Sequence, residues 1–305
     1  MGLFSNKKKL CPICDSPTPR LFPMVVDGMP ICKECKKKVN LPDGMLDGMP
    51  LDDFRRYMAY HQENKALRDT FVEGFNWNFL IYLDMTNRLF RLSSSGEGLV
   101  LEASCLKAFR ILEDDRVLFE SSPEGLRRYA SDIAARAEAL SPLIAQFNVQ
   151  LEQYRQIERM NEMIKNNPES KNTASSVPYM NRPYFEHQLI YNFKLELTME
   201  HPYWGGEHFW LGAAPDLDNT YPNITDFMRK YDRDTEALHT MAVHLMDLIS
   251  PGAPELPIAP AAPAGGAAAP VNDPVEEIRK YKALLDSGVI TEEEFSSKKR
   301  QIMGI

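Results

Sequence analysis

We predict an α+β protein from three features of the sequence. Two C-x-x-C pairs lie near the N-terminus, runs of alternating apolar and polar residues extend from Phe75 to Ser121, and a long helical stretch separates these runs from later ones. Alternation with short turns favours an antiparallel sheet that buries one face. The predicted order is a small head, a connecting helix, a sheet body with a helical insertion and a closing C-terminal helix, a linker, and a two-helix tail.

The head, residues 10–40, contains the two cysteine pairs, with 17 residues between them. This spacing is typical of four thiolates that close a tetrahedral zinc site. We therefore expect one structural Zn²⁺ and a zinc-ribbon-like head in which two short strands flank an Asp27-Gly28 turn. The expected ligands are Cys11, Cys14, Cys32 and Cys35. Cys105 stands apart in an apolar run, and we expect it to be a small buried side chain.

Charge is distributed unevenly along the chain. Residues 1–40 hold eight Lys or Arg and three acidic residues, a net charge of +5, whereas the whole chain carries −8. An acidic body argues against coating by nucleic acid, although the basic head could contact phosphate. Four of the five cysteines lie in the metal pattern, which indicates a reducing compartment, and we expect a cytoplasmic protein without a transmembrane segment. A weak membrane-surface contact through Leu3, Phe4 and the lysines after them stays open.

Residues 51–70 are predicted to form the connecting helix, and residues 71–250 the body. The helix has one apolar stripe, which includes Phe54 and Tyr57. The early strands of the body are expected over 75–83, 88–92, 99–101, 106–112 and 116–120. We interpret the acidic run Glu113-Asp-Asp115 between the last two strands as a solvated turn.

Residues 124–165 are predicted to be a helical insertion that breaks at Ser141-Pro142, because Ser is a favoured N-cap and Pro is tolerated at the first helical position. Leu126, Ile133, Leu140, Phe147 and Tyr154 recur every seven residues. This repeat fits either an intermolecular coiled coil or a bent hairpin packed within the chain, and both alternatives stay open.

Strand character returns over 185–199 and 207–211, and an amphipathic helix is expected to end near Ser250. The run from Gly98 to Asp115 and the later strand Ile190–Met199, followed by this helix, resemble a pleckstrin-homology-like (PH-like) domain. The combination with a four-cysteine module resembles bacterial proteins that join such a module to a PH-like domain. The resemblance implies an antiparallel β-barrel or sheet that binds a partner, and the long insertion departs from a compact barrel.

Residues 251–274 are predicted to be an extended linker, since residues 250–274 include seven prolines and eight alanines. The tail, residues 275–305, resembles the bacterial short C-terminal domain (SHOCT). The family pattern is met at Leu284, Leu285, Gly288, Ile290, Thr291, Glu293, Glu294, Phe295 and Lys299. Gly288 suits the end of one helix, and Thr291 with Glu294 forms a capping box for the next.

Two helices of about ten residues are unstable alone, so the tail must bury its apolar side against something. That side comprises Ile278, Tyr281, Leu284, Leu285, Ile290, Phe295 and Ile302. The resemblance implies that the tail self-associates, giving a homo-oligomer, or docks on a protein partner.

The sequence contains no G-x-S-x-G, H-E-x-x-H or phosphate-cradling glycine loop. His201 and His208 flank a turn, where solvated histidines are expected more than a second metal site. We therefore expect a non-enzymatic zinc-containing adaptor or scaffold whose PH-like body binds a protein or a lipid. The alternative is a nucleic-acid-binding protein that uses Lys33, Lys36, Lys37 and Lys38 of the head.

Overall fold

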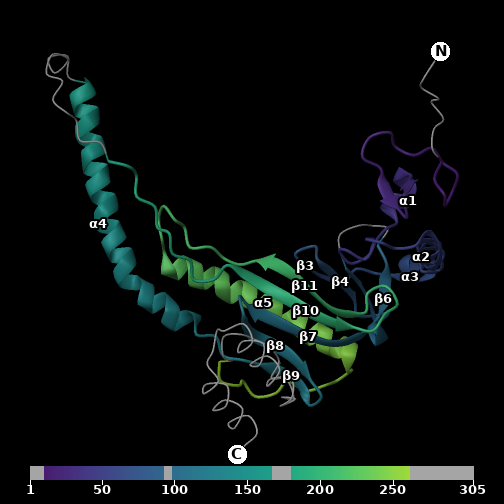
Figure 1. Ribbon diagram of the computed structural model, residues 1–305. Coiled ribbons are helices and arrows are strands. Elements are labelled where there is room, and N and C mark those ends of the chain that lie inside the picture. The colour runs from purple at the N-terminus through teal and green to yellow at the C-terminus, as the bar shows by residue number, and fades with distance from the viewer. Residues whose placement is uncertain (1–9, 93–97, 167–179, 262–305) are drawn as a thin grey trace, which may run out of the picture. The chain divides into compact units, whose positions relative to one another are not determined.

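The computed structural model describes residues 10–92, 98–166 and 180–261 (Figure 1). The chain divides into one unit of Met1–Ala262 and a second of Pro263–Ile305. The predicted tail, with its seven apolar residues, and most of the predicted linker lie outside the described residues. In the part that is described, no helix is long and apolar enough to cross a membrane.

The head consists of a two-stranded hairpin and a short helix. Strands β1 (Met24–Val26) and β2 (Met29–Ile31) pair antiparallel, and α1 (Lys33–Lys37) follows. Asp27 and Gly28 both have positive φ, at 49° and 71°. Positive φ at two consecutive turn residues is the geometry of a hairpin turn whose twist matches the strands. The hairpin predicted around Asp27-Gly28 is therefore confirmed.

The connecting segment forms two helices, α2 (Leu51–Glu63) and α3 (Lys65–Thr70), which meet at Asn64. Phe54, Tyr57 and His61 form the buried side of α2. Asn64 is buried, and its side-chain amide pairs with the backbone of Val100, donating to the carbonyl at 2.7 Å and accepting from the N–H at 3.0 Å. The helix therefore breaks where this side chain turns toward the body.

Two separate antiparallel sheets form the body. The first contains β3 (Phe75–Trp77), β4 (Ile81–Asp84), β5 (Leu89–Leu92) and β6 (Val100–Glu102), in that order. The second has the order β11-β10-β7-β8-β9 and is built from β7 (Leu106–Glu113), β8 (Arg116–Ser122), β9 (Gly125–Arg128), β10 (Asn192–Met199) and β11 (Gly206–Ala213). A 3₁₀ turn, η1 (Ala103–Cys105), connects the sheets. The antiparallel prediction is confirmed, but the sheets do not close into the expected barrel.

Alternation along β10 explains why the five-stranded sheet has one buried face. Phe193, Leu195 and Leu197 are buried, whereas the residues between them are only partly covered. Helix α5 (Ile224–Ile249) covers the buried face, and Figure 1 shows it running behind the strands. Its buried side includes Phe227, Leu238 and Leu245. The closing helix predicted to end near Ser250 is present.

The insertion differs from the sequence prediction in two respects. Residues 125–128 form β9 instead of a helix, and α4 (Ile133–Asn166) is one helix that continues through Pro142. The bent hairpin is therefore wrong as a description of residues 124–165. Ile133, Ala137, Phe147 and Leu151 are buried, and the Phe147 ring lies 5.5 Å from that of Phe185. Pro142 costs the helix one backbone hydrogen bond, and buried residues lie on both sides of it along α4.

Beyond β9, the chain lies along the edge of the five-stranded sheet. Leu126 N–H donates to the Pro254 carbonyl at 3.0 Å, and Leu256 N–H donates to the Leu126 carbonyl at 2.8 Å. Ala259 exchanges two further backbone hydrogen bonds with Arg128 and Ala130. The residues 254–259, which the sequence placed in a linker, thus act as an additional parallel edge strand.

Asp84 organises the turn between β4 and β5. It is 1% exposed, and it accepts hydrogen bonds from the backbone N–H groups of Val72, Thr86 and Asn87 and from the Asn87 side chain, at 2.7–3.0 Å. Burial raises the pKa of this carboxyl, but the hydrogen bonds outweigh burial and leave the pKa below its ordinary value. The ionised form therefore stabilises the fold.

We predict that Asp84→Asn lowers the free energy of unfolding by about 1–3 kcal/mol at pH 7, because buried donors lose their acceptor. A lowered folded-state pKa gives stability that is present above the ordinary value, near 4, and is lost as the pH falls through the folded-state value. Urea unfolding should therefore show that the difference in the free energy of unfolding between wild type and Asp84→Asn is smaller at about pH 3 than at pH 7. Asp43→Asn, the same change at an exposed aspartate, serves as the control. A difference that is unchanged at low pH would contradict this role.

Candidate metal centre

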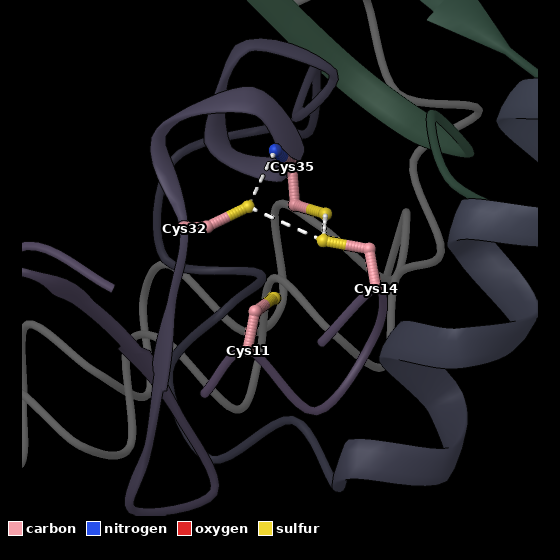
Figure 2. Close-up of side chains that lie close together, drawn as sticks. All are labelled: Cys11, Cys14, Cys32 and Cys35. Carbon is pink, nitrogen blue, oxygen red and sulfur yellow. Dashed lines mark hydrogen bonds between the residues drawn. The ribbon is translucent and has the colours of Figure 1, made fainter. Parts of the chain in front are cut away.

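The four cysteines of the head converge on one point (Figure 2). Cys11 and Cys14 lie in a tight turn in which Cys11 N–H donates to the Ser16 carbonyl at 2.9 Å and Asp15 N–H donates to the Cys11 carbonyl at 3.0 Å. Cys32 is the N-cap of α1, and its sulfur accepts from the Cys35 N–H at 3.4 Å. Two local turns therefore present the four side chains, and the hairpin between them sets their separation.

The spacing of the sulfur atoms fits a tetrahedral metal. All four lie within 4.8 Å of one another, and Cys14 Sγ is 3.5 Å from both Cys32 Sγ and Cys35 Sγ. Ligands at a zinc–sulfur distance of about 2.3 Å stand about 3.8 Å apart in a tetrahedron. A disulfide would instead need about 2.05 Å, and all five cysteines are free. The donor set therefore fits a closed four-sulfur metal site.

The thiols differ in exposure and in acidity. Cys11, Cys32 and Cys35 are buried, whereas Cys14 is exposed. Hydrogen bonds from the side chain and backbone of Ser16 lower the pKa of the Cys14 thiol to about 6, whereas burial raises the pKa of the Cys32 and Cys35 thiols. A bound cation would stabilise the thiolate form of the buried pair, because the thiolate is the species that binds metal.

Next to the cysteine cluster, the head is joined to the body by hydrogen bonds around Tyr57 of α2. The Tyr57 hydroxyl donates to the Lys38 carbonyl at 2.8 Å and accepts from the Asn40 N–H at 2.7 Å. The Trp204 indole donates to the Asn40 carbonyl at 3.1 Å, and the Asn40 side chain donates to the Leu92 carbonyl at 3.3 Å. The cysteines thus share one hydrophobic core with α2 and the β10–β11 turn.

The histidines do not form a second metal site in the described ranges, where the four cysteines are the one cluster of potential ligands. His201 Nδ1 accepts from the backbone N–H groups of Tyr203 and Trp204 at 3.1 Å, and His201 Nε2 lies 2.7 Å from the Tyr60 hydroxyl. Burial lowers the pKa of His201. Both nitrogens are therefore occupied by the turn and by α2. Cys105, expected to be buried, is half-buried.

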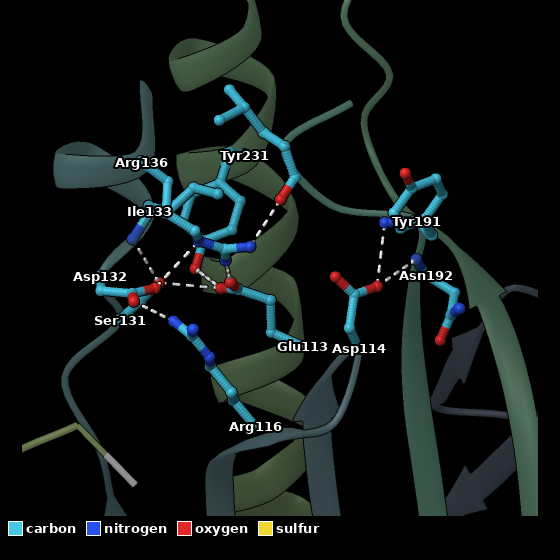
Figure 3. A network of polar contacts seen from close by, with 11 residues as sticks. Glu113, Asp114, Arg116, Ser131, Asp132, Ile133, Arg136, Tyr191, Asn192 and Tyr231 are labelled. Carbon is cyan, nitrogen blue, oxygen red and sulfur yellow. Dashed lines mark hydrogen bonds and ion pairs between the residues drawn. The ribbon is translucent and has the colours of Figure 1, made fainter. Parts of the chain in front are cut away.

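A buried carboxylate was missed by the sequence analysis. Glu113, interpreted as part of a solvated turn, is 1% exposed and forms an ion pair with Arg136 of α4 (Figure 3). The Tyr231 hydroxyl of α5 donates to Glu113 Oε2 at 2.5 Å, and the Ser131 hydroxyl donates to the same oxygen at 2.8 Å. The turn prediction is confirmed for Asp114, whose carboxylate accepts hydrogen bonds from the backbone N–H groups of Tyr191 and Asn192. It is wrong for Glu113.

A cavity of about 690 Å³ lies between the two sheets and the end of α5. Its cations are engaged: the Arg88 guanidinium donates to the Asp247 and Leu248 carbonyls, and Lys107 pairs with Glu200 at 3.0 Å. Arg88 thus caps the C-terminal carbonyl groups of α5, a structural role that suits a cation at this end of a helix.

Comparison with known proteins identifies one domain. Residues 276–303 match the family described as the short C-terminal domain, SHOCT, which confirms the tail predicted from the sequence. An uncharacterized protein of Archaeoglobus fulgidus is 58% identical over 36 residues, which amount to 12% of this chain and 19% of that protein. The chain thus matches about a fifth of that relative. No solved structure matches the chain.

We predict that the wild-type chain binds one zinc ion and that Cys32→Ser lowers zinc occupancy to well below one per chain, because three sulfurs leave an open position. Cys105→Ser is the matched control, since Cys105 lies outside the cluster. Native mass spectrometry of chains purified without chelator measures the occupancy. Full occupancy in Cys32→Ser would exclude Cys32 as a ligand.

We also predict that loss of the metal loosens more than the head. Because Tyr57 and Trp204 bond to the segment 38–40, Cys32→Ser should speed amide exchange in α2 and in the turn 201–205 as well as in residues 10–40. Strands β8 and β9, which lack such bonds to the head, should keep their exchange rates. Hydrogen–deuterium exchange confined to residues 10–40 would show that the head is an independent module.

Proposed function

We propose that the protein is a non-enzymatic adaptor: a zinc-stabilised head, a PH-like body that binds a protein or lipid partner, and a SHOCT tail that self-associates or docks. The four-cysteine cluster carries the proposal. Four sulfurs use every coordination position of a tetrahedral zinc ion, so this site builds structure and leaves no position for a substrate. The metal adds stability to a segment that is too small to fold through burial alone.

The body supports a binding role through its arrangement. Antiparallel strands followed by the closing helix α5 fit the PH-like resemblance, although the sheets remain separate. The ionisable groups with the strongest contacts, such as Glu113 and Asp84, hold turns and helices in place. Such groups are more consistent with a rigid binding scaffold than with acid–base chemistry.

The tail gives the adaptor its valency. A self-associating tail on a tether raises the effective concentration of each partner-binding body. An intermolecular coiled coil along α4 would act in the same direction and stays a prediction. Leu3, Phe4 and the lysines that follow, which motivate a membrane-surface contact, lie outside the described residues.

The alternative function, nucleic-acid binding, is favoured by one observation. Lys33, Lys36 and Lys37 are exposed on α1, although Lys37 pairs with Glu34 at 3.1 Å. Contacts of lysine with phosphate would give an affinity that falls steeply with salt. Absence of binding to DNA and RNA at low ionic strength would remove this alternative.

We predict that removing the tail lowers the assembly state. Truncation after Ala262 is preferable to truncation at Ser250, because residues 254–259 bond to β9 and their loss would expose that edge. Native mass spectrometry should show a smaller assembly for the truncated chain than for the full chain, while zinc stays at one per chain. Equal assembly of both forms would show that the tail does not drive self-association, and the tail would then be used as bait for a partner.

A further inference from the structure

The edge strands of the two sheets differ in what bonds to their outer backbone groups. Beyond β9, the backbone of residues 254–259 satisfies the edge with four hydrogen bonds. At β6, the buried Asn64 side chain takes the place of a neighbouring strand by pairing with both backbone groups of Val100. An open edge presents unpaired N–H and C=O groups that attract another strand, and these two devices remove that possibility.

Two edges remain: β3, which at three residues is too short to offer much of a template, and β11, which is eight residues long. Strand β11 forms the other margin of the five-stranded sheet, opposite β9 (Figure 1). Its eight residues pair with β10 without a register shift, and in the described part of the chain no backbone group bonds to its free edge. Every second residue of such a strand directs its N–H and C=O outward. An eight-residue open edge, about 27 Å long, is therefore available.

The side chains of β11 also lack the features that protect edge strands. The strand contains no proline, lysine or bulge, and Glu207 is its one charged residue. Phe209 and Leu211 are 62% and 57% exposed and lie on the same face, two residues apart. On the opposite face, the Trp77 ring lies against Gly212, which is buried, whereas His208 and Trp210 are partly buried. Edge strands of natural monomeric proteins usually carry a lysine, a proline or a bulge that prevents pairing with another chain.

The neighbouring charges on the exposed face are already paired with one another. Glu196 of β10 pairs with Arg110 at 2.6 Å and with Lys194 at 2.7 Å, and Lys194 Nζ lies 4.8 Å from the centre of the Phe209 ring. A charged ligand would find no free partner among these three residues. The complementary surface is therefore another strand with apolar side chains.

We propose that β11 pairs antiparallel with β11 of a second copy of this chain, so that two five-stranded sheets join into one. Two-fold symmetry lets the same edge serve both copies. Phe209 and Leu211 then lie against the same two residues of the second copy. Because Glu207 lies at one end of the strand, antiparallel pairing separates the two Glu207 carboxylates, whereas parallel pairing in register would place them side by side.

This contact is independent of the tail and goes beyond the proposed adaptor function. One pair of strands makes a small interface, so the dimer is weak on its own. If the tails also associate, the second contact becomes intramolecular and its occupancy rises. The two contacts together would link copies of the body into larger assemblies.

Leu211→Glu is the sharpest test. Leu211 lies directly opposite Lys194 within its own sheet, so the new carboxylate gains a favourable neighbour there while adding charge to the free edge. We expect the dissociation constant of the dimer to rise by about tenfold or more. Leu21→Glu makes the same change at an exposed leucine outside both sheets and should leave the dissociation constant unchanged. Circular dichroism checks that each variant is folded.

Sedimentation velocity of the full chain, with and without Leu285→Asp and Phe295→Asp in the tail, separates the two contacts. A concentration-dependent dimer that persists in the tail variant and is weakened by Leu211→Glu supports pairing through β11. A tail variant that is monomeric up to about 100 µM, a concentration at which contacts of −5 to −6 kcal/mol are half-formed, overturns it. Loss of association with Leu211→Glu but not with the tail changes would retain β11 pairing and reject self-association by the tail.

A measurement on the wild-type protein makes the test independent of folding in the variants. Amide exchange in β11 should be about tenfold slower at high than at low protein concentration, because outward N–H groups become bonded only in the dimer. Amides of β9, already bonded to residues 254–259, should not change. Concentration-independent exchange in β11 would overturn the proposal.

Discussion

The buried carboxylate of Glu113 is the constraint on which the arrangement of the body depends. It lies at the end of β7 and contacts Arg136 of α4, Tyr231 of α5 and Ser131 in the segment before α4. An unpaired buried charge is strongly destabilising, and breaking a buried pair costs about 3–5 kcal/mol. The sheet, the long helix and the closing helix must therefore keep their relative positions for this charge to be compensated. Arg136 extends the constraint by donating to the Leu189 carbonyl at 2.6 Å, just before β10.

The head is connected to this arrangement through a different kind of contact. The four cysteines lie in pairs on two local turns. The segment after the second pair, residues 38–40, is held by hydrogen bonds to the Tyr57 hydroxyl and the Trp204 indole. Polar tips of otherwise buried aromatic side chains make specific bonds at such interfaces. The head is therefore better described as a corner of the body that carries the cysteine cluster than as a separate finger.

The edge strands of the two sheets bear both on the fold and on the assembly that we propose. The two described sheets have four edges: β9 pairs with a backbone segment, β6 pairs with a side-chain amide, β3 is only three residues long, and β11 is a long apolar strand without such protection. The edge device at β6 also affects the connecting segment, because Asn64 lies between α2 and α3. Strand β11, on the margin of the sheet opposite residues 254–259, is the surface that we propose for assembly.

Features that depend on local spacing could be predicted from the amino-acid sequence alone. Two C-x-x-C turns predicted the sulfur cluster, Asp27-Gly28 predicted the hairpin, alternation predicted the buried face of β10, and the Leu284–Lys299 pattern predicted the SHOCT domain. Only the tertiary structure decided that the sheets stay separate, that Glu113 is buried, and that residues 125–128 form a strand. The second and third of these depend on partners more than 100 residues away, Tyr231 for Glu113 and Leu256 for Leu126. Helical periodicity across residues 124–132 could not reveal that a later segment would supply strand hydrogen bonds, because pairing energy comes from the partner and not from the strand itself.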